Sequence, residues 1–160
     1  MTYRPLTPVS APRAVLLAAV AALIASVLLL LAAWGLRAYI AAYHPTPDAN
    51  IGAGMLLTAL PVVLAPLLAW PLLRLVRLPY PGLTALISVP PLLVLSFAGM
   101  MLWVEVDLRM PVDSAYTAID PLLTSGAVDA VVLAASLAIA ALVTSRMHAA
   151  RHAREHGAAG

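Results

Sequence analysis

The chain has no cysteine among its 160 residues. Disulfides, thiolate metal sites, covalent haem attachment and cysteine nucleophiles are therefore excluded. Lysine is also missing, so all nine basic residues are arginines. The formal net charge of +2 is too small and too scattered for a nucleic-acid surface, so no nucleic-acid partner is expected. Since neither a zinc-protease motif, a phosphate loop nor a nucleophile with a base is present, we expect no catalysis and no bound cofactor or metal.

Charge itself is scarce, because only 10% of the residues are charged and 63% are hydrophobic. Four long stretches without a charged residue follow one another along the chain: 14–36, 49–73, 78–104 and 130–145. A bilayer core about 30 Å thick requires about 20 apolar residues per helix. The sequence therefore predicts an all-α integral membrane protein whose residues 1–160 form a single membrane domain.

Prolines and capping residues predict where the helices begin and end, because proline suits a first turn and disfavours helix at the residue before it. We expect helices at about 11–43, 47–77, 81–109 and 121–150, followed by a tail at 146–160. The short connections between the first three helices force antiparallel neighbours. The prediction is an up-down-up-down bundle of four transmembrane helices.

Arginine placement predicts the orientation of this bundle. One side of the membrane receives seven arginines: Arg4, Arg13, Arg74, Arg77, Arg146, Arg151 and Arg154. The other side receives only Arg37 and Arg109, together with most of the acidic residues. The positive-inside rule then places both termini in the cytoplasm, and the chain in the cytoplasmic membrane as a multi-pass protein.

The tail carries two kinds of candidate residue. Arg146, Arg151 and Arg154 are expected to contact anionic lipid headgroups, at about 1 kcal/mol each. His148, His152 and His156 recur at a spacing of four and would share one helical face. Two such histidines can bind a metal, but no further ligand is visible, so lipid contact is the preferred interpretation.

Prolines inside the predicted spans remove backbone donors. Pro61, Pro66 and Pro71 recur every five residues in the second helix, and the Pro90–Pro91 pair lies near the middle of the third. Broken helices of this kind line binding sites in some transporters, so a gating role is one reading. The preferred reading is that these prolines only bend or widen the two helices.

Small residues and a charge pair complete the candidate contacts. Two stripes at a spacing of four favour close helix packing: Ala18, Ala22 and Ser26, then Ala130, Ala134 and Ala138. Asp129 is expected at the outer membrane interface, where Arg37 could pair with it. No charged residue is then left near the middle of any span, which argues against ion-coupled transport.

Together these patterns predict a small membrane protein without catalysis that acts by contact with the lipid bilayer or with another membrane protein, self-association included. The alternative is an oligomeric transport or channel subunit for an uncharged or lipophilic solute, with the proline-bent helices forming the path. The substrate or partner is not specified by any motif.

Overall fold

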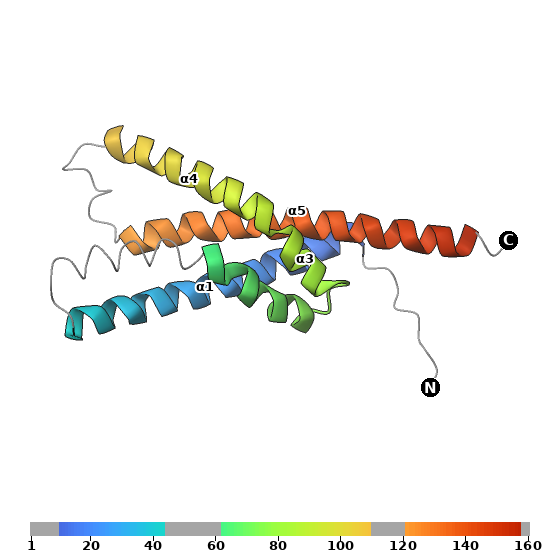
Figure 1. Cartoon of the computed structure of the whole chain (residues 1–160), viewed down its shortest axis with the longest axis horizontal. Helices are drawn as coiled ribbons and strands as arrows, with labels where there is room; N and C mark the ends of the chain where they lie inside the picture. The colour runs from blue at the N-terminus through green and yellow to red at the C-terminus, as the bar shows by residue number, and fades with distance from the viewer. Residues whose placement is uncertain (1–9, 44–61, 110–120, 158–160) are drawn as a thin grey trace.

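A computed structural model describes residues 10–43, 62–109 and 121–157 of the chain, and this part contains helices and no strand. The helices are α1 (Ala11–Tyr43), a helix over Val62–Leu75, α3 (Pro81–Ile87), α4 (Val89–Arg109) and α5 (Pro121–Gly157) (Figure 1). Three stretches are long and apolar enough to cross a membrane: Ala11–Tyr43, Pro81–Val106 and Ser125–Arg151. The all-helical prediction is confirmed, and these three stretches suggest a membrane protein.

The observed helix ends agree with the local signals in most places. α1 has the predicted bounds, and α4 ends at Arg109 as expected. α5 begins at Pro121 as expected but continues to Gly157, so the basic tail extends the same helix instead of following it. The predicted second helix ends at Leu75, and its expected start, together with Pro61, lies outside the described residues.

A Schellman turn ends the helix Val62–Leu75. The amide of Leu78 donates to the Leu73 carbonyl at 3.0 Å, and the amide of Arg77 donates to the Arg74 carbonyl at 3.1 Å. Arg77 adopts the left-handed conformation, with φ of 57°, that this motif requires and that glycine usually supplies. Leu73 and Leu78 are both buried, so the turn also has the hydrophobic contact typical of the motif.

The third predicted helix is divided in two. α3 ends at Ile87, Ser88 forms a turn, and α4 begins at Val89, immediately before the Pro90–Pro91 pair. These prolines have no amide hydrogen, so the helical hydrogen-bond ladder is interrupted there. Pro66 and Pro71, by contrast, lie within the continuous helix Val62–Leu75. The two sets of prolines therefore have different effects on the backbone.

α1 and α5 run antiparallel and form the most extensive contact among α1, α3, α4 and α5 (Figure 1). α1 contributes a face made almost entirely of alanine: Ala14, Ala18, Ala21, Ala22, Ala25, Leu29 and Ala33. α5 contributes larger and smaller residues in turn: Val132, Leu133, Ser136, Leu137, Ala140, Ala141 and Thr144. Ala18 and Ala22 of the first predicted stripe thus lie in this interface, whereas Ser26 is half-buried. Ala130, Ala134 and Ala138 are also only half-buried.

Buried hydroxyls join α3 to α5. Thr84 Oγ1 and Thr144 Oγ1 lie 3.1 Å apart, and both side chains are buried. Each hydroxyl also reaches a backbone carbonyl of its own helix, that of Tyr80 for Thr84 and that of Ala140 for Thr144. Hydrogen bonds between helices hold bundles together where the surroundings are as apolar as the side chains. This pair therefore fixes the short helix α3 against α5.

We predict that the variants Thr84→Val and Thr144→Val are energetically coupled. A double-mutant cycle on unfolding in detergent should give a coupling free energy of about 0.6 kcal/mol, and at most about 1.7 kcal/mol, because one interhelical hydrogen bond is lost in either variant. Ser136→Ala is the control, since Ser136 Oγ donates only to the Val132 carbonyl of its own helix. The assignment would be contradicted if the coupling free energy between Thr84→Val and Ser136→Ala were as large as that between Thr84→Val and Thr144→Val.

Candidate functional site

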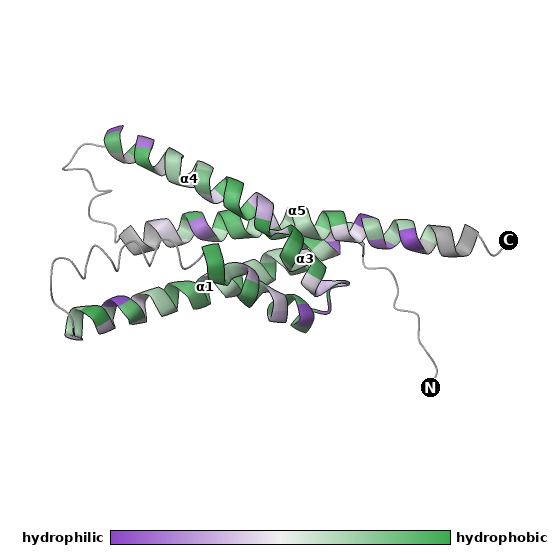
Figure 2. Cartoon of the chain, in the orientation of Figure 1, coloured by the Kyte–Doolittle hydropathy of each residue, from purple (hydrophilic) through white to green (hydrophobic). Residues whose placement is uncertain are grey.

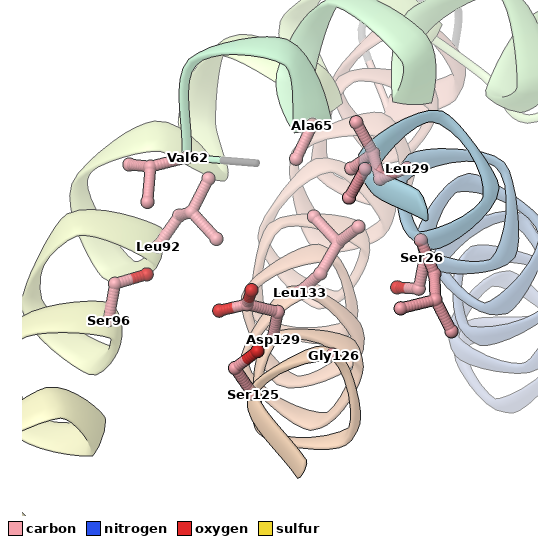
Figure 3. Close-up of a pocket in the computed structure, with 12 residues that line it drawn as sticks. Ser26, Leu29, Val62, Ala65, Leu92, Ser96, Ser125, Gly126, Asp129 and Leu133 are labelled. Atoms are coloured by element: carbon pink, nitrogen blue, oxygen red, sulfur yellow. The ribbon is translucent and has the colours of Figure 1, made fainter. Parts of the chain in front are cut away.

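A cavity of about 40 Å³ lies between α1, the helix Val62–Leu75, α4 and α5. Its walls are mostly apolar, with residues such as Leu29, Ala65, Leu92 and Leu133. Its polar lining consists of the hydroxyls of Ser26, Ser96 and Ser125 and of one carboxyl group, that of Asp129. Figure 3 shows the Asp129 carboxylate turned into the space between α4 and α1.

The cavity lies near the middle of α1 and in the first third of α5. Gly126 in α5 packs against Leu30 in α1 so closely that an added Cβ would lie 3.0 Å from a Leu30 methyl carbon. Because the helices are antiparallel, Asp129 is level with about Val27, the midpoint of Ala11–Tyr43. Ser96, on the opposite wall, is close to the midpoint of Pro81–Val106. Asp129 therefore lies near mid-depth in the bundle, where the sequence was expected to place no charge.

Arg37 and Asp129 are not brought together. Arg37 lies seven residues beyond Leu30 in one direction, and Asp129 lies three residues beyond Gly126 in the other. Ten residues at about 1.5 Å each separate them by about 15 Å along the bundle axis. The expected interfacial pair depended on Asp129 lying at the outer ends of the helices, and the Gly126–Leu30 contact places it deeper.

The prolines lie away from the cavity. Pro71 and Pro90 are exposed, Pro66 and Pro91 are half-buried, and none of these four lines the cavity. The Pro90–Pro91 pair affects the cavity through the backbone, because the next residue, Leu92, forms part of the cavity wall. The division between α3 and α4 thus sets the direction in which α4 carries Ser96.

The predicted lipid-contact residues lie on the part of α5 that extends past the cavity. Arg146 and Arg151 are exposed, and the side chain of Arg154 lies outside the described residues. The Arg151 guanidinium carbon is 5.7 Å from the centre of the Tyr80 ring. The same ring meets His148 edge-on, with ring centres 5.6 Å apart. One end of the bundle therefore combines exposed arginines with two aromatic rings in edge-on contact.

The cavity residues differ from an ordinary catalytic arrangement. Asp129 is the only ionisable residue among those lining the cavity, so no acid–base pair faces it. The described residues contain no group of three or more histidine, cysteine or acidic side chains able to hold a metal ion together. What the arrangement offers is one negative charge and several hydroxyl oxygens within an apolar wall.

Sequence reasoning identified Ser26 and Asp129 separately but not their shared cavity. Ser26 was read as a small residue of a packing stripe, and Asp129 as an interfacial charge. Ser96 had no assigned role beyond being one of the few hydroxyls in the spans. The three residues meet at one cavity only because of how the helices are shifted along their axes relative to one another. No local sequence pattern encodes that shift.

The chain matches no protein-family model, and neither a curated protein nor a solved structure shows significant similarity to it. The candidate site therefore rests on its own geometry.

We predict that Asp129→Leu stabilises the isolated protein. A carboxyl group surrounded by apolar side chains costs about 1–3 kcal/mol without full compensation, and a leucine at this position removes that cost. Thermal unfolding in detergent should show a rise of about 2–4 °C per kcal/mol.

The matched control for this prediction is Leu133→Ala, which truncates a buried residue of the same helix and the same cavity wall. It should destabilise the protein by about 2–5 kcal/mol. If Asp129→Leu destabilised the protein to a similar extent, the carboxyl group would have a structural role, and our reading of the site would be incorrect.

Proposed function

We propose that this chain is a multi-pass protein of the cytoplasmic membrane, with both termini in the cytoplasm. In this proposal it forms an up-down-up-down bundle of four transmembrane helices, catalyses no reaction, and acts through contact with lipid or with another membrane protein. The arginine distribution supports the orientation. The outward faces of the helices support the mode of action.

The observation that carries the proposal is the exposure of α4. In the most apolar part of Pro81–Val106, 17% of the residues are buried, compared with 33% in each of the other two long apolar stretches. α4 diverges from the rest of the bundle in Figure 1, and Figure 2 shows that much of the helix consists of hydrophobic residues. Its exposed side chains are large: Leu93, Val94, Phe97, Met100, Met101, Leu102, Val104 and Leu108.

A helix with so few intramolecular contacts is well suited to contact a helix of another protein. Methionine and aromatic side chains adapt to different partner surfaces, and α4 has Phe97, Met100 and Met101 next to one another on its exposed faces. α1 has exposed residues of similar size, but a larger share of its residues is buried, and its contact with α5 is more extensive than that of α4. We therefore assign the contact with a partner protein to α4 and the contact with bulk lipid to the outer face of α1.

A second candidate function is an oligomeric transport or channel subunit for an uncharged or lipophilic solute. The interrupted backbone between α3 and α4 and the cavity between the helices favour it, because interrupted helices beside a cavity are typical of transport sites. Its weakness is the size of the cavity, which leaves room for only about three water molecules.

The contact function predicts that a photoreactive residue at Phe97 captures one reproducible protein in native membranes. A photoreactive residue at Leu16 should capture lipid, because Leu16 faces outward from α1. The two positions form a matched pair, since both side chains are 64% exposed. The captured band is identified by mass spectrometry, and capture of a second copy of this chain would indicate self-association. If neither position captured any protein, the assignment of α4 would be refuted.

The two candidate functions also differ in vesicles. Proteoliposomes containing only this protein should retain trapped uncharged fluorescent solutes as well as empty liposomes do, because the contact function requires no path across the bilayer. Protein-dependent release of such a solute, increasing with the amount of protein, would favour the transport subunit. The measurement is dequenching of the released dye, with Leu133→Ala protein as a control for leakage through damaged bundles.

A further inference from the structure

The carboxyl group of Asp129 is unusual in its surroundings. The other residues lining the cavity carry no charge, and no arginine or histidine is among them. Within the described residues no hydrogen bond or ion pair is formed by the Asp129 side chain. Ionisable residues near the middle of a membrane-spanning bundle are rare, because they are costly, and they commonly mark ion or proton sites. Asp129 therefore has no charged partner among the described residues that line the cavity.

Ser26 supplies an independent observation. Its hydroxyl oxygen is buried and has no hydrogen-bond partner. Other buried hydroxyls in the bundle bond to a carbonyl of their own helix, at 2.7 Å for Ser88 with Ala85 and 2.7 Å for Ser136 with Val132. Serine in a helix usually satisfies its hydroxyl in this way. Ser26 is one of the residues that line the cavity, so a buried polar atom without a partner lies beside it.

The view into the cavity places these groups opposite one another. In Figure 3 the hydroxyl of Ser26 on α1 and that of Ser96 on α4 are turned toward the side on which the Asp129 carboxylate lies. The three residues come from three different helices. A cation bound at the carboxylate would reach the hydroxyls on the two sides of the cavity directly or through water molecules, for which the cavity has room.

Size and charge restrict what can bind there. The cavity of about 40 Å³ has room for about three water molecules, so it suits a small ion or water better than an organic solute. Its donors are oxygen atoms with a single negative charge, a set that suits a hard cation and not a transition metal. A divalent cation would leave a net positive charge inside an apolar wall, whereas a monovalent cation leaves none.

We propose that the cavity binds a monovalent cation, either a proton or a sodium ion, on the carboxylate of Asp129 and the hydroxyls of Ser26 and Ser96. Binding neutralises the charge within the bundle and gives the Ser26 hydroxyl a partner, directly or through a water molecule. The site is separate from the proposed contact surface, because its residues face the inside of the bundle, whereas the contact surface of α4 faces outward. Either proposal can therefore fail without the other.

The test is modification by dicyclohexylcarbodiimide, an apolar reagent that adds to a protonated carboxyl group to form an N-acylurea without a leaving group. The full-length protein is reconstituted in vesicles of phosphatidylethanolamine and phosphatidylglycerol, and the adduct is located by mass spectrometry of peptides. We expect an adduct on Asp129. Its rate of formation should fall when a higher pH removes the bound proton or when a sodium ion replaces it. Glu105, an exposed residue paired with Arg109, should remain unmodified.

The two cations are distinguished by the salt in the buffer. Slower modification in sodium chloride than in choline chloride at the same pH identifies sodium, whereas dependence on pH alone identifies a proton. In either case Ser26→Ala and Ser96→Ala should shift the half-maximal sodium or proton concentration by about threefold to tenfold, the effect of one lost hydrogen bond.

Ser136→Ala is the matched control for the serine variants. It removes a buried hydroxyl from α5 that already has a carbonyl partner and does not line the cavity, so the half-maximal concentration should remain unchanged. The proposal is overturned if Asp129 is not modified. It is equally overturned if neither cavity serine shifts the midpoint relative to Ser136→Ala. Circular dichroism and gel filtration establish that each variant retains its fold, and modification of Asp129 in the unaltered chain tests the proposal without any variant.

Discussion

The close contact between α1 and α5 is the constraint on which the rest of the structure depends. In apolar surroundings, burying apolar surface between helices brings little gain over leaving it in lipid, so helices associate through close van der Waals packing and hydrogen bonds. The alanine face of α1 allows the backbones to approach, with Ala18, Ala21, Ala22 and Ala25 fully buried. Leu133 and Leu137 of α5 fill the space that these small side chains leave. The other helices are attached to this pair.

The attachment of the remaining helices relies more on polar contacts and backbone geometry. The Thr84–Thr144 pair fixes α3 to α5, and a Schellman turn at Arg77 brings the chain from the preceding helix into α3. The Pro90–Pro91 pair then interrupts the ladder and lets α4 leave in a new direction. As a result α3 is held tightly, whereas the stretch that contains α4 has the smallest buried share of the three long apolar stretches. Contact with a partner protein is therefore assigned to the least constrained helix.

The same packing creates the polar cavity. The Gly126–Leu30 contact fixes the position of α5 along the axis of α1. In this position Asp129 lies beside the middle of α1. An apolar residue at this position would suit the apolar walls better, and a serine at position 26 could have bonded to its own backbone. Residues that stabilise the fold less than the alternatives would are often found at functional sites, whereas the other residues of a protein agree with its fold. The cavity is lined by such residues, with one carboxyl group and several hydroxyls in an otherwise apolar wall.

The sequence by itself determined the helical class, the apolar spans and most helix ends. Ala11, Tyr43, Arg109 and Pro121 lie where prolines and caps predicted them, because these signals act within one turn of helix. The alanine face of α1 was also readable, since a spacing of four defines one side of any helix.

Tertiary structure alone decided the level of each helix, the exact break at Ser88 and the cavity shared by Ser26, Ser96 and Asp129. These features depend on how side chains far apart in the sequence fit together, and one turn of sliding along a helix axis moves a residue by about 5.4 Å. An apolar run shows only that a helix is apolar. The close approach of Gly126 to Leu30 decides which of its neighbours lie at the centre.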